Sequence, residues 1–130
     1  MLASNSKKPL KIAIVAGEVS GDILGSKLME SIRSLDSSVE FIGVGGSKMT
    51  IQGLDSFFVM DEISVMGIIE PLLKLRKLLR LRKELKNFFA DESPDLFIGI
   101  DSPDFNIPIA KFLKKRNIRT IQYVSPSVWA

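Results

Sequence analysis

Short apolar runs that alternate with helix-spaced segments restrict the fold of this chain more than any other feature. Most of the runs end in glycine or other turn residues, and they cover residues 11–16, 39–44, 56–60, 96–100 and 120–124. A continuous apolar run of this length is typical of a parallel strand that is covered on both faces. Between the runs, apolar spacing predicts helices over about 23–32, 47–52, 71–90 and 107–115. The alternation therefore predicts right-handed βαβ units on a doubly wound parallel sheet, which is an α/β fold.

The composition narrows the chemistry that such a fold can perform. The 130 residues are enough for one domain, and 45% of them are apolar, so a sizeable core can form. The chain contains no cysteine and no histidine, which excludes disulfides and thiolate metal sites and removes the commonest general base. Acid–base chemistry must therefore come from Asp, Glu, Lys or Tyr. No stretch approaches the roughly 18 uncharged apolar residues that a membrane-spanning helix needs.

The run Leu96–Ile100 is followed directly by a segment with two carboxylates and an amide, in the order Asp101, Ser102, Pro103, Asp104, Phe105 and Asn106. In open α/β sheets, ligands bind in the crevice beyond the carboxyl ends of the strands, which is where Asp101 is expected to lie. Asp101 is therefore a candidate for acid–base chemistry. The alternative is that Asp101 or Asp104 caps the helix expected from Ile107, as Asp residues often do.

A second candidate element is the loop after the first strand, Gly17 to Asp22. Its glycines stand at 17, 21 and 25, which is not the G-x-G-x-x-G spacing of a dinucleotide site. A glycine-rich turn at the start of a helix still exposes backbone N–H groups that suit an anion, and the Ser20 hydroxyl adds a donor. Glu18 favours a hydroxyl-rich ligand over a bare phosphate. The alternative is a tight turn in which Ser20 or Asp22 caps the helix.

The loop after the second strand has a similar character. Its sequence Gly43-Val44-Gly45-Gly46 allows a backbone or a ligand to approach closely, and it is expected to line the same crevice as the first loop. The alternative is a simple strand-to-helix turn.

The long helix predicted from Pro71 carries more apolar surface than a core requires. Five apolar residues fall on one arc, namely Leu78, Leu81, Leu85, Phe88 and Phe89, and Leu72, Leu75 and Leu79 widen that arc to more than half of the circumference. Residues 71–86 also contain seven Lys or Arg and one Glu, a net charge of +6 in a chain whose total is +3.

Surplus apolar surface edged with cations predicts contact with an anionic membrane surface. The expected lipid-facing positions are Ile69, Leu72, Leu75, Leu78 and Leu79. The alternative is an ordinary packed helix with a solvated basic face. Nucleic acid is a poorer partner, because Phe88 and Phe89 are not interleaved with the basic residues as a base-stacking surface requires.

Five motifs of this chain resemble those of the lipid-A-disaccharide synthase family, in that family's order and spacing. They are Ala16-Gly-Glu-Val-Ser-Gly-Asp22, Gly43-Val-Gly-Gly46, Ser64-Val-Met-Gly67, Ile100-Asp-Ser-Pro-Asp-Phe-Asn106 and Tyr123-Val-Ser-Pro-Ser-Val-Trp-Ala130. The resemblance covers the chain from about Ile12. Ser102 departs from the family, in which alanine is common at that position.

The resemblance implies a GT-B glycosyltransferase with Rossmann-like halves. This family joins UDP-2,3-diacylglucosamine to 2,3-diacylglucosamine 1-phosphate, releasing UDP and forming a β-1,6 linkage with inversion, and it uses no metal or cofactor in the active site. It works at the cytoplasmic face of the inner membrane. The essential aspartate of the family falls on Asp101, which is expected to act as the base. The residues expected to bind substrate are Glu18, Ser20, Gly17, Gly21, Gly45, Gly46 and Asn106.

The resemblance also predicts the domain organisation. Residues 1–10 are expected to be a flexible N-terminus, and residues 11–130 the acceptor-side domain, cut before the donor-binding C-terminal domain. Turnover by these 130 residues alone is not expected. Two other interpretations stay open, which are a non-catalytic membrane-surface binding module and a complete small nucleotide-binding protein.

Overall fold

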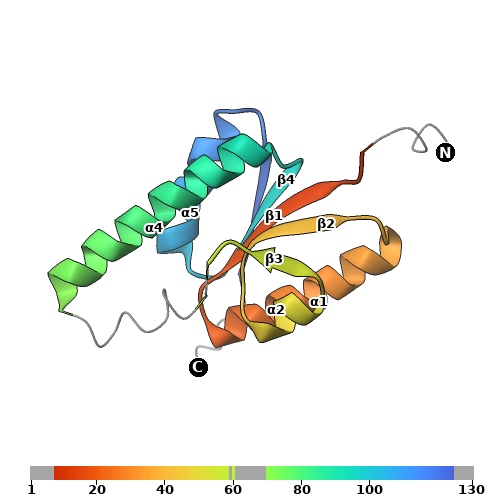
Figure 1. Cartoon of the computed structure of the whole chain (residues 1–130), viewed down its shortest axis with the longest axis horizontal. Coiled ribbons are helices and arrows are strands. Elements are labelled where there is room, and N and C mark those ends of the chain that lie inside the picture. The colour runs from red at the N-terminus through yellow and green to blue at the C-terminus, as the bar shows by residue number, and fades with distance from the viewer. Residues whose placement is uncertain (1–7, 59, 61–69, 125–130) are drawn as a thin grey trace, which may run out of the picture.

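A computed structural model describes residues 8–58, 60 and 70–124 of the chain. Its strands are β1 (Lys11–Ala16), β2 (Glu40–Val44), β3 (Leu54–Ser56), β4 (Leu96–Ile100) and β5 (Arg119–Tyr123). Its helices are α1 (Val19–Leu35), α2 (Ser47–Ile51), α4 (Pro71–Glu92) and α5 (Pro103–Lys114). The strands form one parallel sheet in the order β3-β2-β1-β4-β5, with helices on both faces (Figure 1). The predicted doubly wound α/β fold is confirmed.

The central strands are apolar throughout because each face of the sheet has its own core. Ile12, Ile14 and Ala16 of β1 point to the side covered by α1 and α2, where Met29 and Met49 are fully buried. Ala13 and Val15 point to the side covered by α4 and α5. The alternation of side chains along a strand therefore sends successive residues into two separate cores, and Figure 1 shows the two helix pairs on opposite sides of the sheet.

Helix α4 packs on the sheet through the arc that its sequence predicted. Leu81, Leu85 and Phe89 are buried, and Leu78 and Phe88 pack against the same core. Two cations, Arg82 and Lys86, also lie within that arc, and both contact α5. The Nη1 atom of Arg82 donates to the Asp104 carbonyl at 3.0 Å, and the Lys86 ammonium lies 5.7 Å from the centre of the Phe112 ring. Burial, together with the nearby charge of Arg82, lowers the pKa of Lys86.

The Arg82 contact has a cause in the sequence of α5. Pro108 lies inside this helix and has no N–H to donate to the carbonyl four residues earlier, which belongs to Asp104. Arg82 satisfies that carbonyl instead. A proline that interrupts one helix thus ties it to its neighbour.

Three predicted boundaries were wrong. The helix expected over about 23–32 covers Val19–Leu35 and begins four residues earlier. The third strand was expected over 56–60 but covers Leu54–Ser56, because Gly53 adopts a φ of 102° directly after α2 and the chain pairs with β2 at once. The apolar residues Phe57 and Phe58 that suggested a strand pack instead as aromatic neighbours, and Phe57 stacks on Phe88 at 4.4 Å. The helix expected from Ile107 begins at Pro103, because Asp101 and Ser102 turn the chain sharply into it.

Candidate active site

Asp101 stands at the carboxyl edge of the sheet, immediately after β4, as predicted. Its φ is 49° and that of Ser102 is 40°, so two consecutive non-glycine residues adopt the left-handed conformation. Each such residue costs about 1–3 kcal/mol and persists only where its surroundings enforce it. Asp101 is half-buried, and its main-chain N–H donates to the Tyr123 carbonyl at 2.9 Å. The N-cap of α5 is Ser102, without a side-chain cap hydrogen bond, and Asp104 lies within the first turn of the helix.

Two side-chain amides hold the Asp101 carbonyl. Asn106 donates to it from Nδ2 at 3.0 Å, and Gln122 of β5 donates from Nε2 at 2.7 Å. Asn106 is completely buried, and its Nδ2 also lies 3.4 Å from the carbonyl oxygens of Val15 and Ile100. The structure therefore places Asn106 beneath the surface of the crevice, in contact with main-chain carbonyls, and its expected contact with substrate stays a prediction.

Gln122 was not found from the sequence, although a signal for it exists. It is paired in register with Gly99 of β4, and a Cβ atom at Gly99 would clash with Gln122 Oε1 and lie 2.9 Å from Asn106 Cβ. A glycine inside a buried strand often marks the close approach of another group. Here the missing side chain makes room for the two amides.

The first loop lies at the same edge as Asp101. Ala16 and Ile100 are partners in the β1–β4 register, so Gly17 and Asp101 follow neighbouring strand ends about 5 Å apart. Glu18 is the N-cap of α1 without a side-chain cap. The side chains of Glu18 and Ser20 are exposed, and within the described residues neither makes a hydrogen bond. Both are therefore available to a ligand.

Gly21 has a different position from its neighbours in that loop. It is buried in the first turn of α1, where an added Cβ would lie 3.3 Å from Ala16 Cβ and 3.5 Å from Ile100 Cγ2. Its role in the fold is the close packing of α1 on the strand ends, and it presents no surface to the crevice. Its expected contact with substrate stays a prediction.

The sequence allowed Ser20 or Asp22 to cap α1. Asp22 instead contacts the start of a different helix, α2. Its buried carboxylate reaches the start of α2, where it accepts the N–H groups of Gly46 at 2.9 Å, Lys48 at 3.1 Å and Met49 at 3.0 Å. These are the donors that a helix N-terminus would otherwise offer to an anion. The second loop is thus tied to the first, and Gly46 has no N–H left for a phosphate.

A cavity of about 680 Å³ opens between these two loops. Its lining includes apolar side chains from two segments, Val19 of α1 and Phe57 with Met60 after β3, and also Ser47 and Lys48. Val19 stands between the two polar candidates Glu18 and Ser20 and is 67% exposed. Gly45 and Gly46 line the same cavity. Asp101, Glu18 and Ser20 are not among its lining residues, so the cavity adds an apolar wall next to the first loop.

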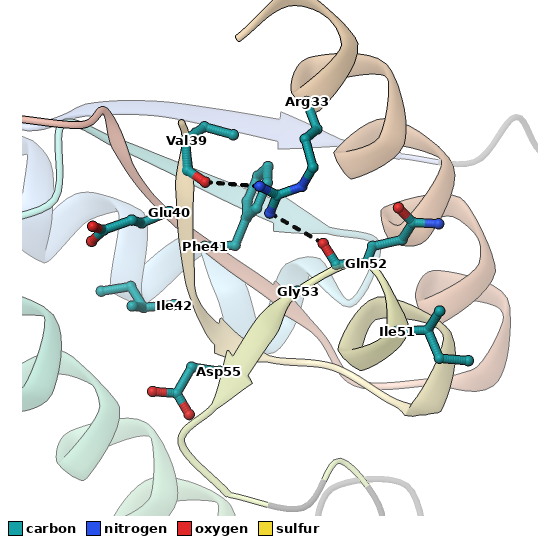
Figure 2. Close-up of a pocket in the computed structure, with 9 residues that line it drawn as sticks. All are labelled: Arg33, Val39, Glu40, Phe41, Ile42, Ile51, Gln52, Gly53 and Asp55. Carbon is teal, nitrogen blue, oxygen red and sulfur yellow. Dashed lines mark hydrogen bonds between the residues drawn. The ribbon is translucent and has the colours of Figure 1, made fainter. Parts of the chain in front are cut away.

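A second cavity, of about 600 Å³, lies elsewhere (Figure 2). It is lined by the beginning of β2, from Val39 to Ile42, and so lies away from the carboxyl ends of the strands. Its one cation, Arg33, is engaged in the fold, because the guanidinium donates to the carbonyls of Val39 at 3.2 Å and Gln52 at 3.1 Å and stacks on Phe41. This cavity holds none of the candidate residues.

The first half of α4 projects beyond the crevice edge of the sheet. Glu92 at the end of α4 pairs with Lys11 at the start of β1 at 3.0 Å, so the helix ends at the amino side of the sheet. A helix of 22 residues is about 33 Å long, whereas a strand of 5 residues spans about 17 Å. The surplus length lies on the side of Asp101, where Figure 1 shows the light-green start of α4 leaving the sheet.

The projecting part of α4 exposes the predicted apolar surface. Leu72, Leu73, Leu75 and Leu79 are 46–59% exposed. Leu73 was not among the predicted positions. Leu78 was, and it is partly buried against the core. Ile69 lies outside the described residues. None of the described helices is long and apolar enough to cross a membrane.

The comparisons with known proteins agree with the resemblance seen in the motifs. The sequence model of lipid-A-disaccharide synthetase matches residues 12–130. The lipid-A-disaccharide synthase of Aliivibrio fischeri (strain MJ11) is 53% identical over 95% of this chain, that of Idiomarina loihiensis is 56% identical over 95%, and that of Pseudomonas syringae pv. tomato is 54% identical over 94%. The chain spans about a third of the length of these relatives, 32% in each case. On this evidence the chain belongs to the lipid-A-disaccharide synthase family.

Proposed function

We propose that this chain is the acceptor-side part of a glycosyltransferase that joins UDP-2,3-diacylglucosamine to 2,3-diacylglucosamine 1-phosphate. The observation that carries the proposal is the position of Asp101, held at the edge of the sheet by a rigid turn and next to the loop whose exposed polar side chains are Glu18 and Ser20. Family membership of residues 12–130 supports the same assignment. The products are the β-1,6-linked disaccharide and UDP.

The chemistry requires one proton to be removed. The primary 6-hydroxyl of the acceptor attacks C1 of the donor sugar from the face opposite to UDP, so the C1–O bond to UDP breaks as the new glycosidic bond forms. The hydroxyl proton passes to the Asp101 carboxylate, and the electron pair of the broken bond leaves with UDP. A strand-end carboxylate suits this step in a chain without histidine.

The loops around Asp101 supply positions for the rest of the acceptor. Glu18 and Ser20 contact sugar hydroxyls or the acceptor phosphate, with the backbone of Gly17 and Gly45 close by. The apolar wall of the 680 Å³ cavity, with Val19 and Phe57, faces the acyl part of the substrate. The donor sugar nucleotide is bound by a C-terminal half that follows this domain in the complete enzyme.

The proposal can be tested with a hybrid enzyme. Residues 12–130 replace the matching segment of the Aliivibrio fischeri relative, and purified hybrid is assayed for UDP release and disaccharide formation. We expect turnover within about tenfold of the parent enzyme, since the inserted domain keeps the same edge chemistry. A hybrid that folds and binds vesicles but forms no disaccharide would instead favour the non-catalytic membrane-surface module.

We further propose that the enzyme is peripheral to the cytoplasmic face of the inner membrane and that the projecting part of α4 contacts it. Four exposed leucines on this part stand among Lys74, Arg76, Lys77 and Arg80. Acyl chains that remain in a bilayer can reach the crevice only if its edge lies at the lipid surface. An apolar face edged with cations gives such binding, with electrostatic attraction to anionic lipids.

Replacing Leu72, Leu75 and Leu79 together by Ser is expected to weaken vesicle binding about tenfold or more. Each leucine loses about 1 kcal/mol or more of apolar burial in the membrane, whereas the folded state loses little because these side chains are already exposed. Co-sedimentation with vesicles rich in anionic lipid measures the effect, and thermal unfolding measures stability.

The matched control is Leu81→Ser, which lies on the buried face of the same helix. It should destabilise the fold strongly, as deletion of core groups does. If the triple variant unfolds as readily as the control, α4 is an ordinary core helix and the membrane assignment fails.

A further inference from the structure

We infer that Gln122, acting with Asn106, is a positioning residue that aims the Asp101 carboxylate at the acceptor hydroxyl. This inference rests on the proposed role of Asp101 as the base. Gln122 itself lies below the turn and reaches Asp101 only through the main chain.

The turn at Asp101 is pinned on both sides of its Cα atom. Its N–H donates to the Tyr123 carbonyl at 2.9 Å, which continues the β4–β5 pairing by one residue. Its carbonyl accepts from Gln122 at 2.7 Å and from Asn106 at 3.0 Å. A carbonyl oxygen has two lone pairs, so these two donors satisfy it completely. With both peptide groups fixed, the direction of the Asp101 Cα–Cβ bond is set before any substrate arrives.

The arrangement is not one that stability alone would favour. Asp101 and Ser102 both adopt the left-handed conformation, which is unfavourable for residues with a side chain. Within the described residues, the buried side-chain atoms that lack a hydrogen-bond partner are Asn106 Oδ1 and Gln122 Oε1. Each amide thus leaves its oxygen unsatisfied while its nitrogen holds Asp101. Strain and unsatisfied groups of this kind gather where a catalytic group is held in place.

The neighbouring strand β4 leaves space for the Gln122 side chain at Gly99. Gly99 lies opposite Gln122 in the sheet, and any side chain there would displace the Gln122 amide. Two independent substitutions can therefore release Asp101 from Gln122. Gln122→Met removes the donor and keeps the length of the side chain, whereas Gly99→Ala crowds both amides, since its Cβ would clash with Gln122 and lie 2.9 Å from Asn106 Cβ.

The test is a kinetic comparison in the hybrid enzyme described above. Gln122→Met is expected to lower kcat by roughly tenfold while the KM for the acceptor stays within about twofold, because a base that is less well aimed affects the reaction step more than binding. Gly99→Ala should reproduce this pattern. Thr120→Val is the matched control on the same face of the same strand and should leave kcat unchanged, since the Thr120 side chain makes no hydrogen bond to the Asp101 turn.

A double substitution separates positioning from a general structural effect. If Gln122 acts through Asp101, Gln122→Met should cause no further loss of kcat in the Asp101→Asn background. A further tenfold loss in that background, or unchanged kcat in the single variant, overturns the inference. If Asp101→Asn itself leaves turnover intact, the proposed base is wrong, and that outcome is distinguishable because it does not involve Gln122.

Discussion

Asp101→Asn is expected to lower turnover of the hybrid enzyme by about a hundredfold or more without disturbing its fold. The amide keeps the size of the carboxylate but cannot accept the proton of the acceptor hydroxyl, and a positioned general base contributes about 10²–10⁴-fold to rate. The turn itself should survive, because its main-chain N–H and carbonyl make the bonds to Tyr123, Gln122 and Asn106. UDP release under saturating substrate gives the turnover, and circular dichroism checks the fold.

Asp104→Asn provides the control for this experiment. Asp104 is an exposed carboxylate in the first turn of α5, three residues along the same segment, and its carbonyl rather than its side chain contacts Arg82. Its substitution should change turnover by less than about fivefold, since no proton passes to it in the proposed step. Near-normal turnover of Asp101→Asn, or an equal loss in both variants, would mean that Asp101 is not the base.

Asp22→Asn is expected to lower the free energy of unfolding by about 3 kcal/mol or more. The buried carboxylate accepts three main-chain N–H groups from the start of α2, and hydrogen bonds to a charged acceptor contribute about 1.5–3 kcal/mol each. The amide keeps one acceptor oxygen but turns a donor toward N–H groups that then lack a partner. Chemical denaturation of the 130-residue chain measures the change.

Two further measurements locate the effect of Asp22. Hydrogen exchange at the amides of Gly46, Lys48 and Met49 should accelerate, whereas exchange in β4 should follow only the global loss of stability. Asp91→Asn, at an exposed position near the end of α4, is the control and should change stability by less than about 0.5 kcal/mol. A loss of stability in Asp22→Asn as small as in this control would contradict the contact with α2.

The fold of this protein could be predicted largely from local patterns. The apolar runs of β1, β2 and β4 and the helical spacing of α4 appear with nearly the predicted bounds, because a strand covered on both faces must be apolar throughout and a packed helix needs one apolar arc. The place of Asp101 at a strand end follows from the same pattern. The start of α5 could not be predicted from this pattern, since it depends on two residues that adopt an unfavourable left-handed conformation.

The sequence by itself therefore determined the sheet, its two cores, the surplus apolar face of α4 and the edge at which the carboxylate stands. Only the tertiary structure decided which groups hold that edge together. Asp22 reaches the start of α2, 24 or more residues further along the chain, and Gln122 reaches back 21 residues to Asp101. Periodicity reports whether a position is buried, but the partner of a buried polar group is set by which strands and helices lie side by side. For this reason the candidate base could be found from its motif, whereas the residues that aim it could not.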